Sequence, residues 1–146
     1  MKRTSRTRGN AMVEFALAVG VLLPMLFGTF EFGYAFYTYN RLIAAVREGG
    51  RYASLRAYDS STTTPSDAYL AAVQNAVVYA NPAGSGTPVV SGLTTGQIGV
   101  TMTMVNGVPD MVTVSVTSFT MDTLIKTFNL ANKPSAAFRY EGRYAP

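Results

Sequence analysis

The hydrophobic pattern divides the chain into one long apolar segment and a later region of alternating residues. From Ala11 to Phe30, twenty residues carry one charge, that of Glu14, and the sixteen residues from Phe15 onward carry none. A membrane-spanning helix needs about 17–25 predominantly apolar residues. The segment has no polar face at helical spacing, which argues against a helix that lies on a membrane surface. The pattern therefore predicts a transmembrane helix over residues 10–36.

Both flanks of this helix suit a membrane boundary. The positive-inside rule places a basic N-terminal flank in the cytoplasm, and the basic residues here are Lys2, Arg3, Arg6 and Arg8. Aromatic side chains favour the membrane–water interface, and they follow the apolar run as Phe30, Phe32, Tyr34, Phe36, Tyr37 and Tyr39. A buried helix of a soluble protein is the alternative, but it leaves both flanks unexplained. We expect a single pass with the rest of the chain outside the cytoplasm.

Residues 37–57 predict a continuation of the same helix beyond the membrane. Leu42, Val46, Gly49 and Ala53 recur at helical spacing and form one narrow face. The helix is expected to end near Arg56. The pair at positions 49 and 50, both glycine, indicates either a soft point in the helix or a place where another element packs closely.

Residues 58–146 predict a small head domain, so the expected fold class is α+β: a long N-terminal helix, then one helix packed on a short antiparallel sheet. The second helix is expected to begin with Thr64 as its N-cap and to end at Asn81-Pro82. Alternation of apolar and polar residues predicts strands. The remaining elements expected are short strands at 88–90, 98–105, 111–119 and 135–140, a five-residue hairpin loop at 106–110, and a short helical insertion at 121–130.

Composition and charge narrow the functional classes. The chain of 146 residues has no Cys and no His, so it offers neither disulfides nor histidine chemistry. The net charge of +4 comes from residues 1–9, because the remainder holds eight basic and eight acidic groups. We therefore expect no nucleic-acid partner. The scattered carboxylates indicate no catalytic residues, metal site, cofactor or small-molecule substrate, and an enzyme in the head is the weakest hypothesis.

A stripe of small residues lies within the predicted transmembrane helix. Ala16, Gly20, Pro24 and Gly28 recur every four residues, and such stripes let membrane helices approach each other closely. Pro24 also removes one backbone hydrogen bond and is expected to kink the helix. The alternative is that Gly and Pro are simply frequent in membrane helices. Glu31, which closes the apolar run, is either an interaction site or a solvated helix residue.

The N-terminal third resembles a known family. A basic leader (1–9) ending in Gly9, then Glu14 and Phe15 within a long apolar helix, is similar to the class III signal of type IV pilins. Together with Y-N-R-L-I-A-A-V-R-E-G-G-R-Y-A at 39–53, it resembles the TadE-like pseudopilins of the tight-adherence (Tad/Flp) pilus system. The resemblance covers residues 8–53, and A-A-F-R-Y-E at 136–141 is a weaker likeness to the family's last strand.

The resemblance implies that a prepilin peptidase cuts between Gly9 and Asn10, and that Glu14 serves processing or assembly. The cut would give Asn10 an α-ammonium group about one helical turn before Glu14. In a bundle of helices that group could pair with the Glu14 carboxylate of a neighbour, since a charge near the membrane core is costly without a partner. The alternative is a headgroup-level carboxylate with no such role.

These features predict a structural, minor pseudopilin-like component of a Tad/Flp-type pilus that supports surface adhesion. It would reside in a bacterial inner membrane, with the option of incorporation into a surface pilus. The expected partners are other pilins or pseudopilins through the N-terminal helix, the prepilin peptidase, the inner-membrane assembly platform and the lipid bilayer. The alternative is an unprocessed, single-pass binding or scaffold protein with an extracytoplasmic domain. Cleavage of the leader separates the two.

Overall fold

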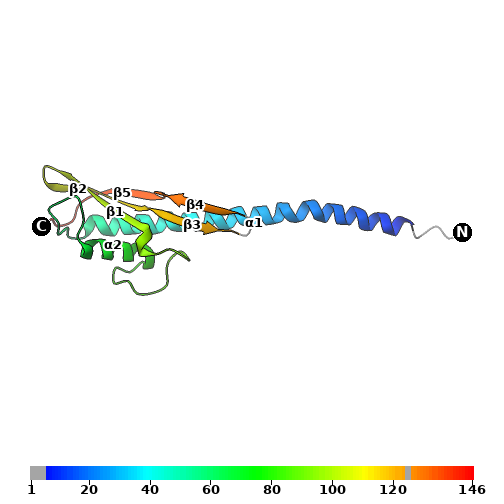
Figure 1. Cartoon of the computed structure of the whole chain (residues 1–146), viewed down its shortest axis with the longest axis horizontal. Coiled ribbons are helices and arrows are strands. Elements are labelled where there is room, and N and C mark those ends of the chain that lie inside the picture. The colour runs from blue at the N-terminus through cyan, green and yellow to red at the C-terminus, as the bar shows by residue number, and fades with distance from the viewer. Residues whose placement is uncertain (1–5, 124–125) are drawn as a thin grey trace.

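A single long helix runs through the whole molecule, and a head domain packs along its C-terminal half (Figure 1). The computed structural model describes residues 6–123 and 126–146. Its elements are α1 (Arg6–Leu55), α2 (Asp67–Tyr79), the short 3₁₀ helix η1 (Thr95–Gln97) and five strands: β1 (Ile98–Val105), β2 (Val108–Val116), β3 (Ser118–Asp122), β4 (Thr127–Ala131) and β5 (Ser135–Arg139). The predicted α+β class, with its long N-terminal helix, is confirmed.

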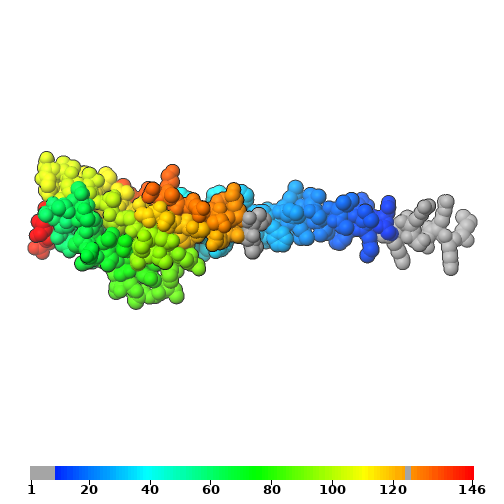
Figure 2. Space-filling view, viewed as in Figure 1, coloured from blue at the N-terminus to red at the C-terminus, as the bar shows by residue number. Residues whose placement is uncertain are grey.

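Helix α1 has 50 residues, which corresponds to a length of about 75 Å. It ends one residue before the predicted end at Arg56. It begins earlier than expected, at Arg6, so Gly9 and Asn10 lie inside it. Pro24 also lies inside α1, and the helix continues on both sides of it. The N-terminal half of α1 projects from the head (Figure 2), whereas burial begins at Thr38.

The C-terminal half of α1 forms the centre of the head. Leu42, Val46 and Ala53 are completely or almost completely buried, as their spacing predicts. The two glycines mark close packing. A side chain at Gly49 would collide with Val77 of α2, and a Cβ at Gly50 would lie 2.7 Å from the ring of Phe138 in β5. Two different elements therefore approach α1 at adjacent residues.

Helix α2 begins two residues later than predicted, because Ser66 and not Thr64 is its N-cap. The Ser66 hydroxyl accepts a hydrogen bond from the backbone N–H of Tyr69 at 3.1 Å and donates one to Asp59 at 2.6 Å. This satisfies one of the free N–H groups of the first turn. The helix ends at Tyr79, and its C-cap Ala80 has a positive φ of 53° and directly precedes Asn81-Pro82, where the end was expected.

The loop between α2 and β1 contains no strand at residues 88–90, so that prediction is wrong. Val89 instead donates a backbone hydrogen bond to the carbonyl of Val78 at 2.7 Å, and Val90 is buried in the core. The apolar pair therefore anchors the loop on the end of α2. Its hydrophobicity reflects burial and not strand pairing.

The main sheet has three antiparallel strands in the order β1-β2-β5. Its inner face is apolar, with Val112, Val114 and Val116 fully buried. The hairpin between β1 and β2 is tighter than the predicted five-residue loop, since Val105 pairs with Val108 across two residues. These are Asn106 and Gly107, with φ of 52° and 77°. Two consecutive positive φ angles suit the twist of a two-residue hairpin, which favours Asn-Gly.

Residues 121–123 and 126–130 are not helical, which corrects the predicted helical insertion over the part of 121–130 that the structure describes. Strands β3 and β4 pair antiparallel, with Ser118 opposite Ala131 and Asp122 opposite Thr127. Backbone hydrogen bonds from Val116 N to Pro134 O at 3.0 Å and from Asn132 N to Thr117 O at 3.2 Å link this pair to β2 and β5. The four strands therefore form one extended hairpin, whose β3–β4 end runs back along α1 (Figure 1).

Candidate functional site: the exposed apolar half of helix α1

The N-terminal half of α1 is apolar and carries its side chains on the outside. By length and composition α1 is suited to cross a membrane, and none of its most apolar stretch is buried inside the protein. Large side chains are exposed on every side of this half: Met12, Val13, Phe15, Leu17, Val21, Leu22, Leu23, Met25, Leu26, Phe27, Phe30, Phe32, Tyr34, Phe36 and Tyr37. Such a surface is unfavourable in water. It requires lipid or other protein chains around it.

The predicted cleavage and assembly residues all lie on this exposed surface. Gly9 and Asn10 are exposed, and a side chain at Gly9 would meet no neighbouring atom within 4 Å. Glu14 and Phe15 follow on the same helix, with the Phe15 ring 71% exposed. Asn10 and Glu14 are separated by four residues, about one helical turn. Of the basic leader, residues 1–5 lie outside the described residues.

The predicted small-residue stripe makes no close contact within the described chain. A Cβ at Gly20 or Gly28 would have no neighbour within 4 Å, unlike one at Gly49 or Gly50. Ala16 and Pro24 are exposed as well. The chain's own packing therefore does not require small residues at these positions.

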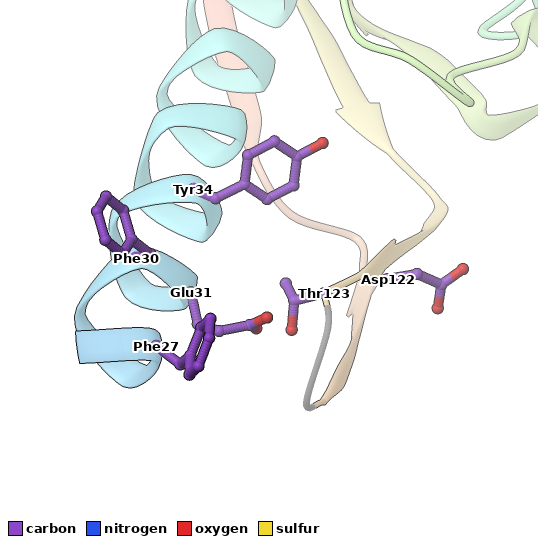
Figure 3. Close-up of a pocket in the computed structure, with 6 residues that line it drawn as sticks. All are labelled: Phe27, Phe30, Glu31, Tyr34, Asp122 and Thr123. Carbon is purple, nitrogen blue, oxygen red and sulfur yellow. The ribbon is translucent and has the colours of Figure 1, made fainter. Parts of the chain in front are cut away.

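Glu31, by contrast, lies next to another part of the protein. A groove of about 520 Å³ separates α1 from the end of the β3–β4 hairpin, and its walls are Phe27, Phe30, Glu31, Tyr34, Asp122 and Thr123. Figure 3 shows the Glu31 carboxylate directed across the groove toward Thr123, whereas Asp122 points away from α1. The end of the hairpin thus reaches the level at which the apolar run closes.

Two further grooves continue this contact on the neighbouring faces of α1. One, of about 300 Å³, is lined by Gly28, Glu31, Phe32, Lys126 and Phe128. The other, of about 170 Å³, lies between the aromatic residues of α1 and the inner face of the hairpin, including Met121 and Leu130. The Lys126 ammonium stands 5.6 Å from the centre of the Phe128 ring. Aromatic and aliphatic side chains therefore form most of the contact.

Sequence reasoning missed this hairpin, although a signal was present. Buried or half-buried Phe119, Met121, Phe128 and Leu130 alternate with exposed Thr120, Asp122, Thr127 and Asn129. That is a period of two, typical of strands. Each strand has only five residues, so the alternation was too short to be recognised in the sequence.

The opposite end of the head is held together by tyrosines. The Tyr140 hydroxyl accepts a hydrogen bond from the Tyr58 backbone N–H at 2.8 Å and lies 2.8 Å from the Arg56 carbonyl oxygen. The Tyr69 hydroxyl donates to the Ala53 carbonyl oxygen at 2.5 Å. Burial raises the pKa of Tyr58, Tyr69 and Tyr140 above the usual value, because the charged phenolate is poorly solvated there. The end of α1 and the C-terminal segment are thereby joined.

Residues 9–51 match the family model described as TadE-like protein. This segment is TadE-like. The match confirms the resemblance recognised in the sequence. No curated protein and no solved structure matches the chain.

The TadE-like segment combines two different environments. It contains the exposed apolar half of α1, and it extends to Arg51, within the part of α1 that packs in the head. Within residues 6–123 and 126–146, no three acidic side chains gather in a group able to hold a metal ion.

Proposed function

We propose that this protein is a structural, minor pseudopilin-like component of a Tad/Flp-type pilus assembly. The observation that carries the proposal is the division of one TadE-like helix into an exposed apolar half and a half buried in its own head. The exposed half suits a bilayer before assembly and the helices of other pilins after it. The match to the TadE-like family supports association with a Tad pilus and a structural role.

Processing is the first step of the proposed mechanism. A prepilin peptidase removes the leader 1–9 between Gly9 and Asn10. Gly9 is exposed and has open space around its Cα, so an enzyme has access to the bond. Because α1 begins at Arg6, the peptidase must open the first turns of the helix before it cuts. A helix end unwinds more readily than its middle.

Assembly is the second step. Cleavage gives Asn10 a new α-ammonium group at the N-terminal edge of the apolar run. Along one helix, the Asn10 ammonium and Glu14 lie about one turn apart. Between chains staggered along a bundle, the ammonium of one helix can meet the carboxylate of the next. Ala16, Gly20, Pro24 and Gly28 then allow a neighbouring helix to approach closely.

The proposed location follows from charge and exposure. The basic leader favours a cytoplasmic N-terminus in a bacterial inner membrane, with the head on the other side. The partners are other pilins or pseudopilins, the peptidase, the inner-membrane assembly platform and the bilayer. In the filament, a minor subunit of this shape would initiate, cap or adapt the pilus used for surface adhesion.

The deciding experiment is the mass of the native protein isolated from membranes. The proposal expects a mature chain that begins at Asn10, and Gly9→Leu is expected to block processing because a branched side chain does not fit where glycine is cut. Gly20→Leu, a matched change in the same helix, should leave processing intact. A native chain that retains residues 1–9 would favour the unprocessed, membrane-anchored binding or scaffold protein.

A further inference from the structure

The β3–β4 hairpin ends beside the boundary of the apolar run. The run from Ala11 to Phe30 corresponds to about 30 Å of helix, which equals the thickness of a bilayer's hydrocarbon core. Glu31 is the first residue beyond it. Thr123 and Lys126 line grooves with Phe27, Gly28 and Glu31, so they lie within about one helical turn of that boundary.

The two faces of the hairpin differ in a way that suits this position. The inner face, with Met121, Phe128 and Leu130, lies against α1. The outer face is polar and exposed, and its side chains bond to each other: Thr127 donates to Asp122 at 3.1 Å, and the Thr120 hydroxyl donates to Asn129 at 3.1 Å. Hydroxyl and amide groups are well placed among lipid headgroups and poorly placed in hydrocarbon.

The aromatic residues of α1 at the same level extend this boundary around the helix. Phe30, Phe32, Tyr34, Phe36 and Tyr37 are each more than half exposed. Aromatic side chains gather at the headgroup level of membranes. The hairpin stands among them, beside a helix that is suited to span the bilayer.

Resting on α1 crossing a membrane, but not on a pilus role, we propose that Asp122, Thr123, Lys126 and Thr127 of the β3–β4 hairpin lie in the lipid headgroup layer as a second membrane contact. The occupant of its outer surface is a zwitterionic phospholipid. The charges beside the hairpin end complement such a headgroup, because Lys126 is cationic whereas Asp122, which points away from α1, is anionic. Lys126 meets the phosphate and Asp122 faces the ammonium. With two contacts, the head is held at a fixed height and tilt above the bilayer.

The test measures the depth of the hairpin in the full-length protein. Because the chain has no cysteine, Thr127→Cys places one fluorophore at the hairpin end, and Val108→Cys places one at the opposite end of the extended hairpin. The protein is inserted in vesicles of phosphatidylethanolamine and phosphatidylcholine. Acrylamide in water should quench the fluorophore at position 127 roughly threefold less than at 108, and a quencher attached to lipid headgroups should show the reverse order.

Two results would overturn the proposal. Equal quenching by acrylamide at positions 127 and 108 would place the hairpin in water. Protection of position 127 from both acrylamide and the lipid quencher would show that protein, and not lipid, covers it.

A charge reversal tests the headgroup contact directly. After Lys126→Glu, the charged side chains at this end of the hairpin are all negative. Because like charges repel, the phosphates should move away, and acrylamide quenching at position 127 should rise about twofold. Lys133→Glu, just beyond the far end of β4, is the matched control and should leave the quenching at position 127 unchanged. Lys126→Gln, which removes the charge with little change in size, should give a smaller rise. Identical quenching in all three variants would contradict the contact.

Discussion

The two halves of α1 belong to one continuous helix but have opposite surroundings. Residues 9–36 are more apolar, yet their side chains are exposed, whereas residues 38–55 contribute fully buried side chains to the core. Glycine makes the contrast sharpest. Gly20 has open space around it, and Gly49 is in close contact with Val77. Hydrophobicity alone therefore does not reveal whether a helix packs within its own chain, because the more apolar half is the exposed one.

The largest effect is expected from a pair of matched glycine substitutions. Gly49→Leu forces a side chain into the contact with α2, and overpacking of this kind costs about 3 kcal/mol or more when backbone must move. Gly20→Leu adds the same side chain to an open surface and should change the stability of the head by less than about 0.5 kcal/mol.

The stability of the head in both variants is measured by thermal unfolding of the full chain in detergent. Circular dichroism and the protease resistance of the head follow the unfolding. Equal stability of the two would show that the close packing at Gly49 relaxes easily, and it would remove the contrast between the halves.

A smaller loss of stability is expected at alkaline pH. It concerns the part of the head that packs around the buried half of α1. Tyrosine in an unfolded chain ionises near pH 10, whereas burial raises the pKa of Tyr69 in the folded head. The folded state therefore binds more protons above pH 10. Stability is complete below that pH and falls above it, by about 1.4 kcal/mol per pH unit for each tyrosine that ionises only on unfolding.

Unfolding midpoints between pH 8 and pH 12 test this expectation. Tyr69→Phe should make the decline less steep, at the expense of the hydrogen bond to Ala53. A wild-type midpoint that stays constant across this range would contradict the role of burial.

The smallest effect on stability, with the clearest effect on assembly, is expected from Glu14→Gln. This substitution keeps the size of the side chain and removes its charge in the exposed half of α1. The head should keep its unfolding midpoint to within about 1 °C, because it contains none of residues 9–36 in its core.

Surface pili and captured pilins are counted after the level and processing of the variant are shown to be normal, and a marked fall is expected. Glu48→Gln is a control at an exposed carboxylate outside the apolar run, where it weakens the two contacts with Arg51 at 2.7 Å and 3.3 Å. Normal piliation in Glu14→Gln would leave Glu14 as a headgroup-level carboxylate.

Regular local patterns were sufficient to predict much of this fold. The apolar run predicted α1, the spacing of Leu42, Val46 and Ala53 predicted its buried face, and alternation predicted β1 with its correct bounds. The cap at Ser66 was missed because Thr64 offers the same chemistry two residues earlier, and only the hydrogen bond to Tyr69 distinguishes them.

The position of the β3–β4 hairpin could not be predicted in the same way. Its place beside Glu31 depends on the line of β2 and β5, which the hairpin extends, and on the direction of α1 beneath them. These are relations between distant parts of the chain, which no local pattern records. The surroundings of the exposed half of α1 are a similar case, because they lie outside the chain.

The close approach at Gly49 and Gly50 has a mechanical consequence. Residues 42–54 of α1, about 20 Å of helix, contact both α2 and β5. A force applied along α1 is therefore distributed over contacts with two elements and does not act on one of them alone. A pull along α1 is therefore expected to move α2 and β5 together with the helix, so that the head keeps its orientation around the helix axis.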